Sequence, residues 1–204
     1  MTCKRCGSVP QISTVPGEAL FNCAVTPLHS KLISILEESG YSPVIEGAVI
    51  RVQVDSFQQL LNSFTQRNDL AEVEAEGINL LYLEKGQQFD FSSIAQSKSL
   101  KKWLFLSNNR EFMDIFENNS LTTWFQPIIS LSNQQIVAYE CLSRGVKADG
   151  SLMRPDILFK LAEENDLLFF LDRLCRENAL KTAAVKKITA DIFINFINIH
   201  FCCF

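Results

Sequence analysis

The stretch Gln134–Leu142, which reads QQIVAYECL, decides the predicted fold of the C-terminal part of the chain. Side chains alternate along a strand, so Ile136, Ala138 and Glu140 share one face. Glu140 is therefore a carboxylate beside aliphatic side chains, near the C-terminal end of the strand. An isolated buried carboxylate is too costly to leave unpaired. We therefore expect Glu140 to meet a cation, a proton-sharing partner or a metal ion.

A second polar side chain interrupts the stretch Thr189–Ile197, TADIFINFI, near its end. This almost continuous apolar run predicts a strand buried on both faces, as in a parallel α/β sheet. Asn195 again lies at the C-terminal end, where α/β barrels carry their catalytic groups. Glu140 and Asn195 together offer hard oxygen ligands, which suit Mg²⁺, Mn²⁺ or Ca²⁺. The alternative is structural: Glu140 pairs with Arg144, and Asn195 binds the backbone at the strand end.

The rest of the chain divides into three predicted parts. Residues 1–88 form a small α+β domain, residues 89–120 a helical connector, and residues 121–204 a part with strands and helices. The first part has predicted strands at Gly17–Val25, Gly47–Asp55 and Ile78–Leu83, with helices over Pro27–Glu38 and after Ser56. The third part has a strand at Thr123–Ile129, a helix that begins at Pro155 and a helix that carries Leu168, Leu171, Leu174 and Cys175.

Short blocks of the third part resemble a known family in their order and spacing. The blocks are Trp124–Ile129 (WFQPII), Ile136–Arg144 (IVAYECLSR), Arg154–Asp156 (RPD) with Leu161–Glu164 (LAEE), Leu171–Arg173 (LDR) and Ile194–Phe196 (INF). Together they resemble the opening of an EAL domain, the bacterial cyclic-di-GMP phosphodiesterase family. The resemblance implies an α/β barrel of the TIM type, preceded by an N-terminal regulatory domain.

The resemblance also implies roles for individual residues. Glu140 and Asn195 would bind a catalytic Mg²⁺ or Mn²⁺ ion, and Gln126 and Arg144 would contact cyclic-di-GMP, Arg144 through phosphate. A guanidinium group suits phosphate oxygens because of its fork geometry. The intact parent would hydrolyse cyclic-di-GMP to linear pGpG. Cys141 replaces the family's usual alanine on the opposite face from Glu140, so we expect only a packing change there.

A literal Glu-Ala-Leu tripeptide, Glu18–Leu20, stands in the N-terminal part outside any matching block, and we interpret it as coincidence.

The third part is too short for a whole barrel. It holds 84 residues, from 121 to 204, whereas a (β/α)₈ barrel takes about 250. We therefore expect an α+β domain followed by the first strands and helices of an incomplete barrel, without a complete catalytic set. Such a fragment would expose apolar strand faces, be unstable or aggregate, and not hydrolyse cyclic-di-GMP.

Two other functions stay open. The chain could be a non-catalytic cyclic-di-GMP-binding or protein-interaction module, or a small metal-dependent hydrolase outside the family, which would need more clustered carboxylates.

Four residues near the N-terminus suggest a zinc site. Cys3 and Cys6 have the spacing of half a zinc site, and Cys23 with His29 could supply two further ligands. The alternative is a flexible N-terminus with two exposed thiols. A thioredoxin-like redox motif fits less well, because no strand precedes Cys3.

Composition and net charge limit the classes of molecule that the chain is expected to bind. The chain of 204 residues has 19 Lys and Arg against 23 Asp and Glu, a net charge of −4, which argues against a nucleic-acid coat or a polybasic membrane patch. No apolar run of about 18 residues predicts a transmembrane helix, and the N-terminus lacks the apolar region of a signal peptide. We expect a cytoplasmic protein that binds cyclic-di-GMP, without DNA, RNA or membrane, and that can dimerise through the EAL part or the N-terminal domain.

Overall fold

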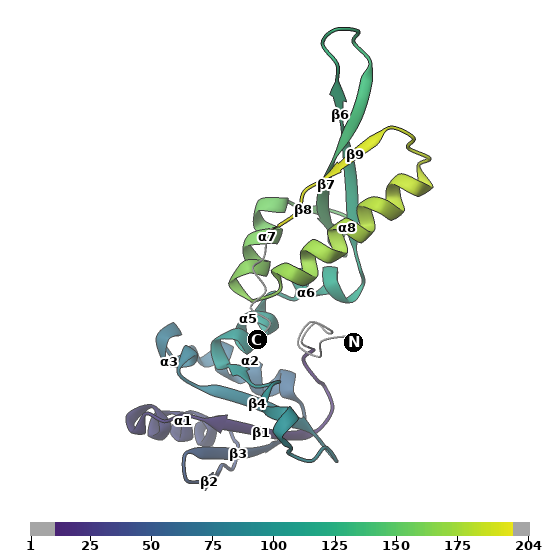
Figure 1. The fold of residues 1–204 in the computed structure, drawn as a ribbon. Coiled ribbons are helices and arrows are strands. Elements are labelled where there is room, and N and C mark those ends of the chain that lie inside the picture. The colour runs from purple at the N-terminus through teal and green to yellow at the C-terminus, as the bar shows by residue number, and fades with distance from the viewer. Residues whose placement is uncertain (1–10, 198–204) are drawn as a thin grey trace. The chain divides into compact units, whose positions relative to one another are not determined.

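The computed structural model describes residues 11–197, and the chain divides into two compact units between Asn109 and Arg110 (Figure 1). The sequence instead places a separate connector at residues 89–120. In the structure that segment is shared: helix α5 (Leu100–Asn108) belongs to the first unit, and helix α6 (Arg110–Glu117) to the second. Each helix is amphipathic and buries its apolar face within its own unit, so neither acts as a free spacer.

The first unit combines an antiparallel sheet with helices, in the order β2-β3-β1-β4-β5. Its elements are β1 (Gly17–Asn22), α1 (Thr26–Glu38), β2 (Val44–Glu46), β3 (Val49–Val54), α2 (Phe57–Arg67), α3 (Glu72–Glu76), β4 (Asn79–Glu84), α4 (Phe91–Ile94), β5 (Lys98–Ser99) and α5. The order of the first four strands is that of a split βαβ, or ferredoxin-like, unit. Of these strands and helices, β2, α3 and β5 are short elements that the sequence pattern does not reveal.

Alternation along the strands of the first unit selects its core. Phe21 of β1 and Ile50 of β3 are fully buried, whereas their chain neighbours are not. An aromatic cluster completes the core: the ring of Phe57 stacks on Tyr82 with centroids 4.5 Å apart and meets Trp103 edge-on at 4.9 Å. The indole of Trp103 also donates a hydrogen bond to the carbonyl oxygen of Leu80 at 2.9 Å. This bond attaches α5 to the sheet.

The second unit is built on a long hairpin. Its elements after α6 are β6 (Leu121–Ile129), β7 (Ile136–Val146), β8 (Leu152–Met153), α7 (Pro155–Glu164), α8 (Leu168–Val185) and β9 (Asp191–Ile194). Strands β6 and β7 pair antiparallel, whereas β9 returns through α7 and α8 to pair parallel with β7 (Figure 1). This connection is a βαβ crossover, the usual way to make two strands parallel.

The last strand is less buried than the sequence predicts. The apolar run Thr189–Ile197 favours a strand buried on both faces, but β9 alternates between exposed and half-buried residues, and Phe193 is 58% exposed. Among the described residues β9 pairs with β7 alone. The prediction of full burial is therefore wrong for this structure, because hydrophobicity alone does not supply a covering layer.

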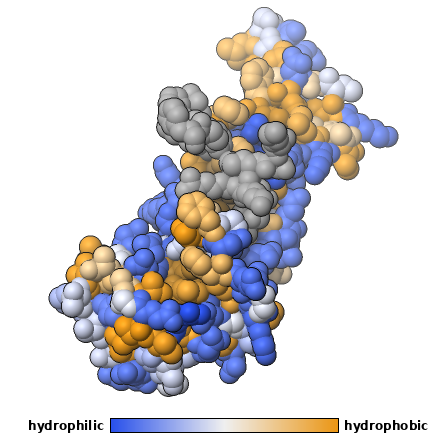
Figure 2. Space-filling model, turned by 60° about the horizontal axis from the view of Figure 1, so that its bottom comes forward, coloured by the Kyte–Doolittle hydropathy of each residue, from blue (hydrophilic) through white to orange (hydrophobic). Residues whose placement is uncertain are grey.

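Large apolar side chains also reach the surface around the β6–β7 hairpin, where Figure 2 shows apolar atoms near the tip of the second unit. The most exposed on β6, β7, β9 and their loops are Trp124, Ile129, Leu131, Ile136, Val137, Phe193 and Phe196. This agrees with the expected exposure of apolar strand faces. No helix among residues 11–197 combines the length and hydropathy that a membrane span requires.

A glycine at the start of β1 provides a test of the first unit. A Cβ atom at Gly17 would lie 2.3 Å from the backbone oxygen of Leu83 and 2.6 Å from the hydroxyl of Tyr82. We expect Gly17→Ala to lower the free energy of unfolding by about 1–3 kcal/mol, the usual cost of overpacking. Gly77→Ala is the matched control, because its Cβ would meet its nearest atom at 3.5 Å. Urea unfolding followed by Trp103 fluorescence measures both; equal stability of the two variants would contradict the packing.

Candidate functional site

Three strands of the second unit place the expected site residues on one face of the sheet. In the register of β6 and β7, Gln126 lies opposite Glu140, and in that of β7 and β9, Glu140 lies opposite Phe193. These three residues therefore form one row across the sheet. Arg144 lies further along β7 on the same face, four residues after Glu140. The register thus brings together side chains from three separate stretches of the sequence.

Glu140 and Asn195 are in direct contact, although 55 residues separate them. The Asn195 amide Nδ2 donates a hydrogen bond to Glu140 Oε1 at 3.1 Å. Within residues 11–197 no ion pair joins Glu140 to Arg144, so the structure does not adopt the alternative pairing weighed from the sequence. Asn195 is exposed and Glu140 half-buried. A carboxylate and a side-chain amide thus lie together at a solvent-accessible edge.

Arg144 is held by an aromatic ring that the sequence analysis did not assign to the site. Its guanidinium carbon lies 5.1 Å from the centroid of the Trp124 ring, a cation–π contact. Its Nη1 also donates to the carbonyl oxygen of Ser143 at 2.8 Å. Trp124 lies opposite Leu142, hence diagonal to Arg144. Diagonal neighbours on one sheet face are within reach of long side chains, so a correct register would have revealed this partner.

The opposite face of the same strands packs on α8. The Thr123 hydroxyl donates to the Asn178 side-chain oxygen at 2.8 Å, and the Asn178 amide donates to the Leu121 carbonyl oxygen at 3.0 Å. Cys141 points to this face and is 4% exposed, as expected for a packing position. Burial raises the pKa of the Cys141 thiol, and the nearby Glu140 carboxylate adds to the rise. The thiol is therefore a neutral packing group.

A buried carboxylate fixes the chain just after Asn195. Asp172 on α8 is 3% exposed and accepts hydrogen bonds from Arg176 Nε at 2.9 Å and from the backbone N–H of Ile197 at 3.3 Å. The Arg176 guanidinium in turn lies over the Phe196 ring, 5.0 Å from its centroid. The charge of Asp172 is thus paired, as a buried carboxylate requires. These contacts limit where Asn195 can lie.

The donor set at Glu140 fits part of a hard-cation site. Mg²⁺ is bound through one or two carboxylates together with water and substrate phosphate, so few protein ligands suffice. Glu140 supplies a carboxylate and Asn195 an amide oxygen, once the amide turns that atom toward the ion. Among residues 11–197 no group of three or more His, Cys, Asp or Glu side chains could hold a metal ion. These two side chains alone would thus give a metal ion only part of its coordination sphere.

In a comparison with protein families, residues 109–204 match the family described as "EAL domain". This part of the chain is therefore similar to EAL domains. A curated relative, "Probable cyclic di-GMP phosphodiesterase PdeB" of Escherichia coli (strain K12), is 38% identical over 61 residues, which cover 30% of this chain and 12% of the relative. This match makes part of the chain similar to a protein whose printed name is that of a probable cyclic di-GMP phosphodiesterase.

Solved structures that contain EAL domains resemble the chain only distantly. "Vibrio cholerae LapD S helix-GGDEF-EAL (apo)" is 14% identical to this chain, with a TM-score of 0.37. The alignment covers 91% of this chain and 55% of the LapD chain. "Structure of EAL Enzyme Bd1971 - cAMP and cyclic-di-GMP bound form" is 12% identical, with coverages of 93% and 57% and a TM-score of 0.37. The chain thus spans little more than half of these structures and about an eighth of the curated relative.

The expected zinc ligands fall in two groups. Cys3 and Cys6 lie outside the described residues. Cys23 is buried, and its thiol donates to the Val25 carbonyl oxygen at 3.6 Å, which also accepts the backbone N–H of His29 at 2.9 Å. Within residues 11–197, His29 Nε2 is buried and has no hydrogen-bond partner. The zinc site stays a prediction. A bound zinc ion would give the unpartnered imidazole nitrogen of His29 a partner.

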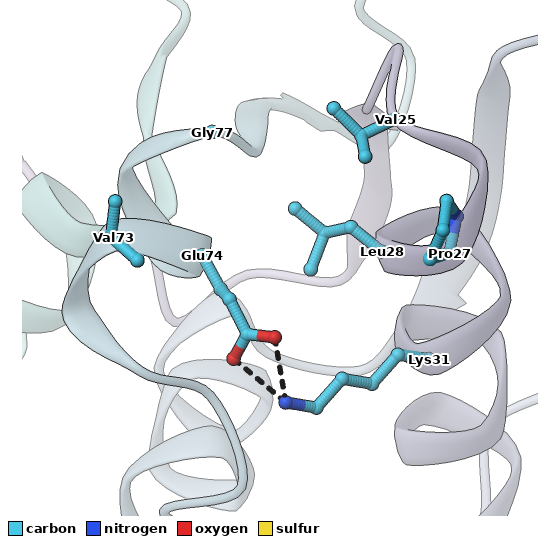
Figure 3. Close-up of a pocket in the computed structure, with 7 residues that line it drawn as sticks. All are labelled: Val25, Pro27, Leu28, Lys31, Val73, Glu74 and Gly77. Carbon is cyan, nitrogen blue, oxygen red and sulfur yellow. Dashed lines mark hydrogen bonds and ion pairs between the residues drawn. The ribbon is translucent and has the colours of Figure 1, made fainter.

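The first unit also carries a shallow hollow of about 370 Å³ between the start of α1 and α3 (Figure 3). Leu28 and Val73 contribute apolar walls, and Lys31 forms an ion pair with Glu74 across it at 2.7 Å. The pair lowers the pKa of the Glu74 carboxyl, chiefly through the Lys31 hydrogen bond. Both charged groups of the hollow are thus paired with each other, and none of the expected site residues lines it.

Metal analysis of the purified chain tests the zinc prediction. We expect one zinc per chain, lost in a Cys3→Ser/Cys6→Ser variant and reduced in His29→Gln, because three ligands bind zinc far more weakly than four. The Cys202→Ser/Cys203→Ser variant is the control and keeps its zinc. Replacement of zinc by Co²⁺ gives a thiolate-to-metal absorption band that reports the cysteine ligands directly. A chain without stoichiometric zinc, or a first double variant that retains it, would rule the site out.

Proposed function

We propose that the second unit supplies the metal-binding and phosphate-binding edge of a cyclic-di-GMP phosphodiesterase. In this proposal β6, β7 and β9 are the opening strands of an α/β barrel of the TIM type, and the intact parent hydrolyses cyclic-di-GMP to linear pGpG. The observation that carries the proposal is the contact of Asn195 with Glu140 on the face that also holds Arg144. The family match of residues 109–204 supports it.

Arg144 and Gln126 bind the ligand in this proposal. Arg144 offers its guanidinium fork to a phosphate, with the Trp124 ring limiting the orientations that the side chain can adopt. Preorganisation of this kind lowers the entropy lost on binding. Gln126 lies opposite Glu140 in the register, so its amide can reach a ligand held at the same edge. The two side chains approach the ligand from adjacent strands.

Glu140 and Asn195 hold a Mg²⁺ or Mn²⁺ ion in this proposal. Such an ion polarises a phosphoryl oxygen and lowers the pKa of a bound water. The existing hydrogen bond keeps the two side chains adjacent, and a half-turn of the Asn195 amide about its Cβ–Cγ bond exchanges its nitrogen for its oxygen. Phosphodiester hydrolysis also needs a base to take a proton from water. Glu140 is committed to the ion, so residues beyond this pair must supply the base.

Isothermal titration of cyclic-di-GMP into the purified chain, with and without Mg²⁺ or Mn²⁺, tests the binding roles. We expect Arg144→Gln to weaken binding about 10-fold or more, because a charge-assisted hydrogen bond is worth about 1.5–3 kcal/mol. Arg154→Gln is the matched control, an exposed arginine of the same unit paired with Asp156. Glu140→Gln should abolish the effect of the metal ion. Equal affinities of the Arg144 and Arg154 variants would refute the phosphate role.

Turnover distinguishes the phosphodiesterase proposal from a binding module. We expect the 204-residue chain with Mn²⁺ to release no pGpG by chromatography, because Glu140 and Asn195 form only part of a metal site. Measurable turnover would show that this expectation is wrong. Binding of cyclic-di-GMP that is independent of metal and unchanged in Glu140→Gln would favour the non-catalytic module instead.

A further inference from the structure

Asn195 lies just beyond the paired part of β9. The last residue of β9 that pairs with β7 is Ile194, opposite Cys141, and Asn195 follows it. The strand pairing therefore ends before the residue that contacts Glu140. Burial does not fix this position either, because Asn195 and the next residue, Phe196, are exposed. The contact of Asn195 with Glu140 thus depends on what holds the chain after the strand.

Two charged side chains of helix α8 hold the two residues that follow Asn195. One oxygen of the Asp172 carboxylate, Oδ1, accepts the backbone N–H of Ile197 at 3.3 Å. The other oxygen, Oδ2, accepts Arg176 Nε at 2.9 Å, and the Arg176 guanidinium lies 5.0 Å from the centroid of the Phe196 ring. Asp172 is 3% exposed, and a charge-assisted hydrogen bond is strong where water is excluded.

We propose that Asp172 and Arg176 are positioning residues for the metal ion of the proposed function. They hold the two residues after Asn195 against α8, and thereby keep the Asn195 side chain beside Glu140. Neither residue contacts the ion. The inference rests on the proposed function, because it takes the ion from there. Its own content is that an ion pair on the opposite side of the sheet sets the affinity for that ion.

The directions of these contacts explain how α8 acts through the sheet. The helix packs on the face of β6 that carries Thr123, opposite the face of the proposed site. Phe196 meets Arg176 on the side of α8, whereas Asn195 meets Glu140 on the other side. The two neighbouring side chains thus alternate as in a strand, although β9 has already ended. A change that frees Phe196 from α8 therefore also frees Asn195.

Both oxygens of the carboxylate are needed for this arrangement. An asparagine side chain has one acceptor oxygen, and its nitrogen is a donor. In Asp172→Asn one oxygen cannot replace two, so the new N–H group would face either Arg176 Nε or the Ile197 N–H, which are both donors. The variant keeps the volume of the side chain but removes one of the two contacts and the charge that pairs with Arg176. It therefore tests the contacts without opening a cavity.

Mn²⁺ titration of the full chain, followed by the EPR signal of the free ion, tests the inference. We expect Asp172→Asn and Arg176→Gln each to weaken Mn²⁺ binding at least about three-fold, less than the loss of about 10- to 100-fold for partners bonded directly to a metal ligand. Glu177→Gln and Arg173→Gln are the matched controls, because they break an exposed ion pair of the same helix, 3.5 Å long. Exposed pairs contribute little, so both controls should bind Mn²⁺ like the unmodified chain.

A second measurement separates positioning from a general loss of structure. Cyclic-di-GMP is titrated into each variant with and without Mn²⁺. Asp172→Asn should lower the affinity only when Mn²⁺ is present, because Arg144 and Gln126 bind the ligand without the ion in the proposed function. A variant that disturbs the fold lowers both affinities. Equal losses with and without Mn²⁺ in Asp172→Asn and in Arg176→Gln would overturn the positioning role.

The outcomes distinguish this inference from the proposed function. If Glu140→Gln abolishes Mn²⁺ binding and neither the Asp172 nor the Arg176 variant weakens it, the positioning role is refuted and the metal role stands. If the unmodified chain binds no Mn²⁺, or if Glu140→Gln binds it unchanged, the metal role of the proposed function is refuted and the positioning role fails with it. Weaker binding in both α8 variants, with unchanged controls, supports the inference.

Discussion

The parallel pairing of β7 with β9 is the constraint on which the site depends. Glu140 and Asn195 are far apart in sequence, and only the crossover through α7 and α8 places the two strands side by side. The pairing sets Glu140 opposite Phe193, so the next residue on the same face, Asn195, reaches the carboxylate. A slip of one residue in this register would turn Asn195 to the other face. The position of β9 therefore determines whether the Glu140 carboxylate and the Asn195 amide meet.

Polar contacts of α8 hold that position where hydrophobic burial is weak. Strand β9 is short and only half-buried, so apolar contacts alone fix it poorly. Asp172 binds the backbone of Ile197 beyond the strand, and Asn178 of the same helix binds Thr123 and Leu121 on β6. One helix thus connects the first and last strands of the sheet through directional bonds. Such bonds fix register more strictly than non-directional apolar contact.

Local alternation of side chains explains what the sequence revealed. It placed Glu140 with the aliphatic face of its strand and Cys141 opposite, and both positions agree with the structure. It could not reveal that Trp124 meets Arg144, because that contact depends on the register between two strands. It also could not reveal the exposure of Phe193 or the division of the chain at Asn109, because both depend on which surfaces tertiary packing covers. The ligand roles of Gln126, Glu140, Arg144 and Asn195 came from the family resemblance.

Glu18 and Glu140 begin similar tripeptides but have different hydrogen-bond partners. The position of a glutamate in the fold, and not the tripeptide itself, therefore decides whether its carboxylate is available to a cation. Glu18 of the literal Glu-Ala-Leu lies in β1, where its carboxylate accepts hydrogen bonds from Arg51 at 2.7 Å and Gln53 at 2.8 Å. Its charge is already balanced by a guanidinium. Glu140 has, among the described residues, a neutral amide as its hydrogen-bond partner. A half-buried carboxylate without a cationic partner attracts a metal ion more strongly than a paired one, which favours Glu140 as the site of a divalent ion.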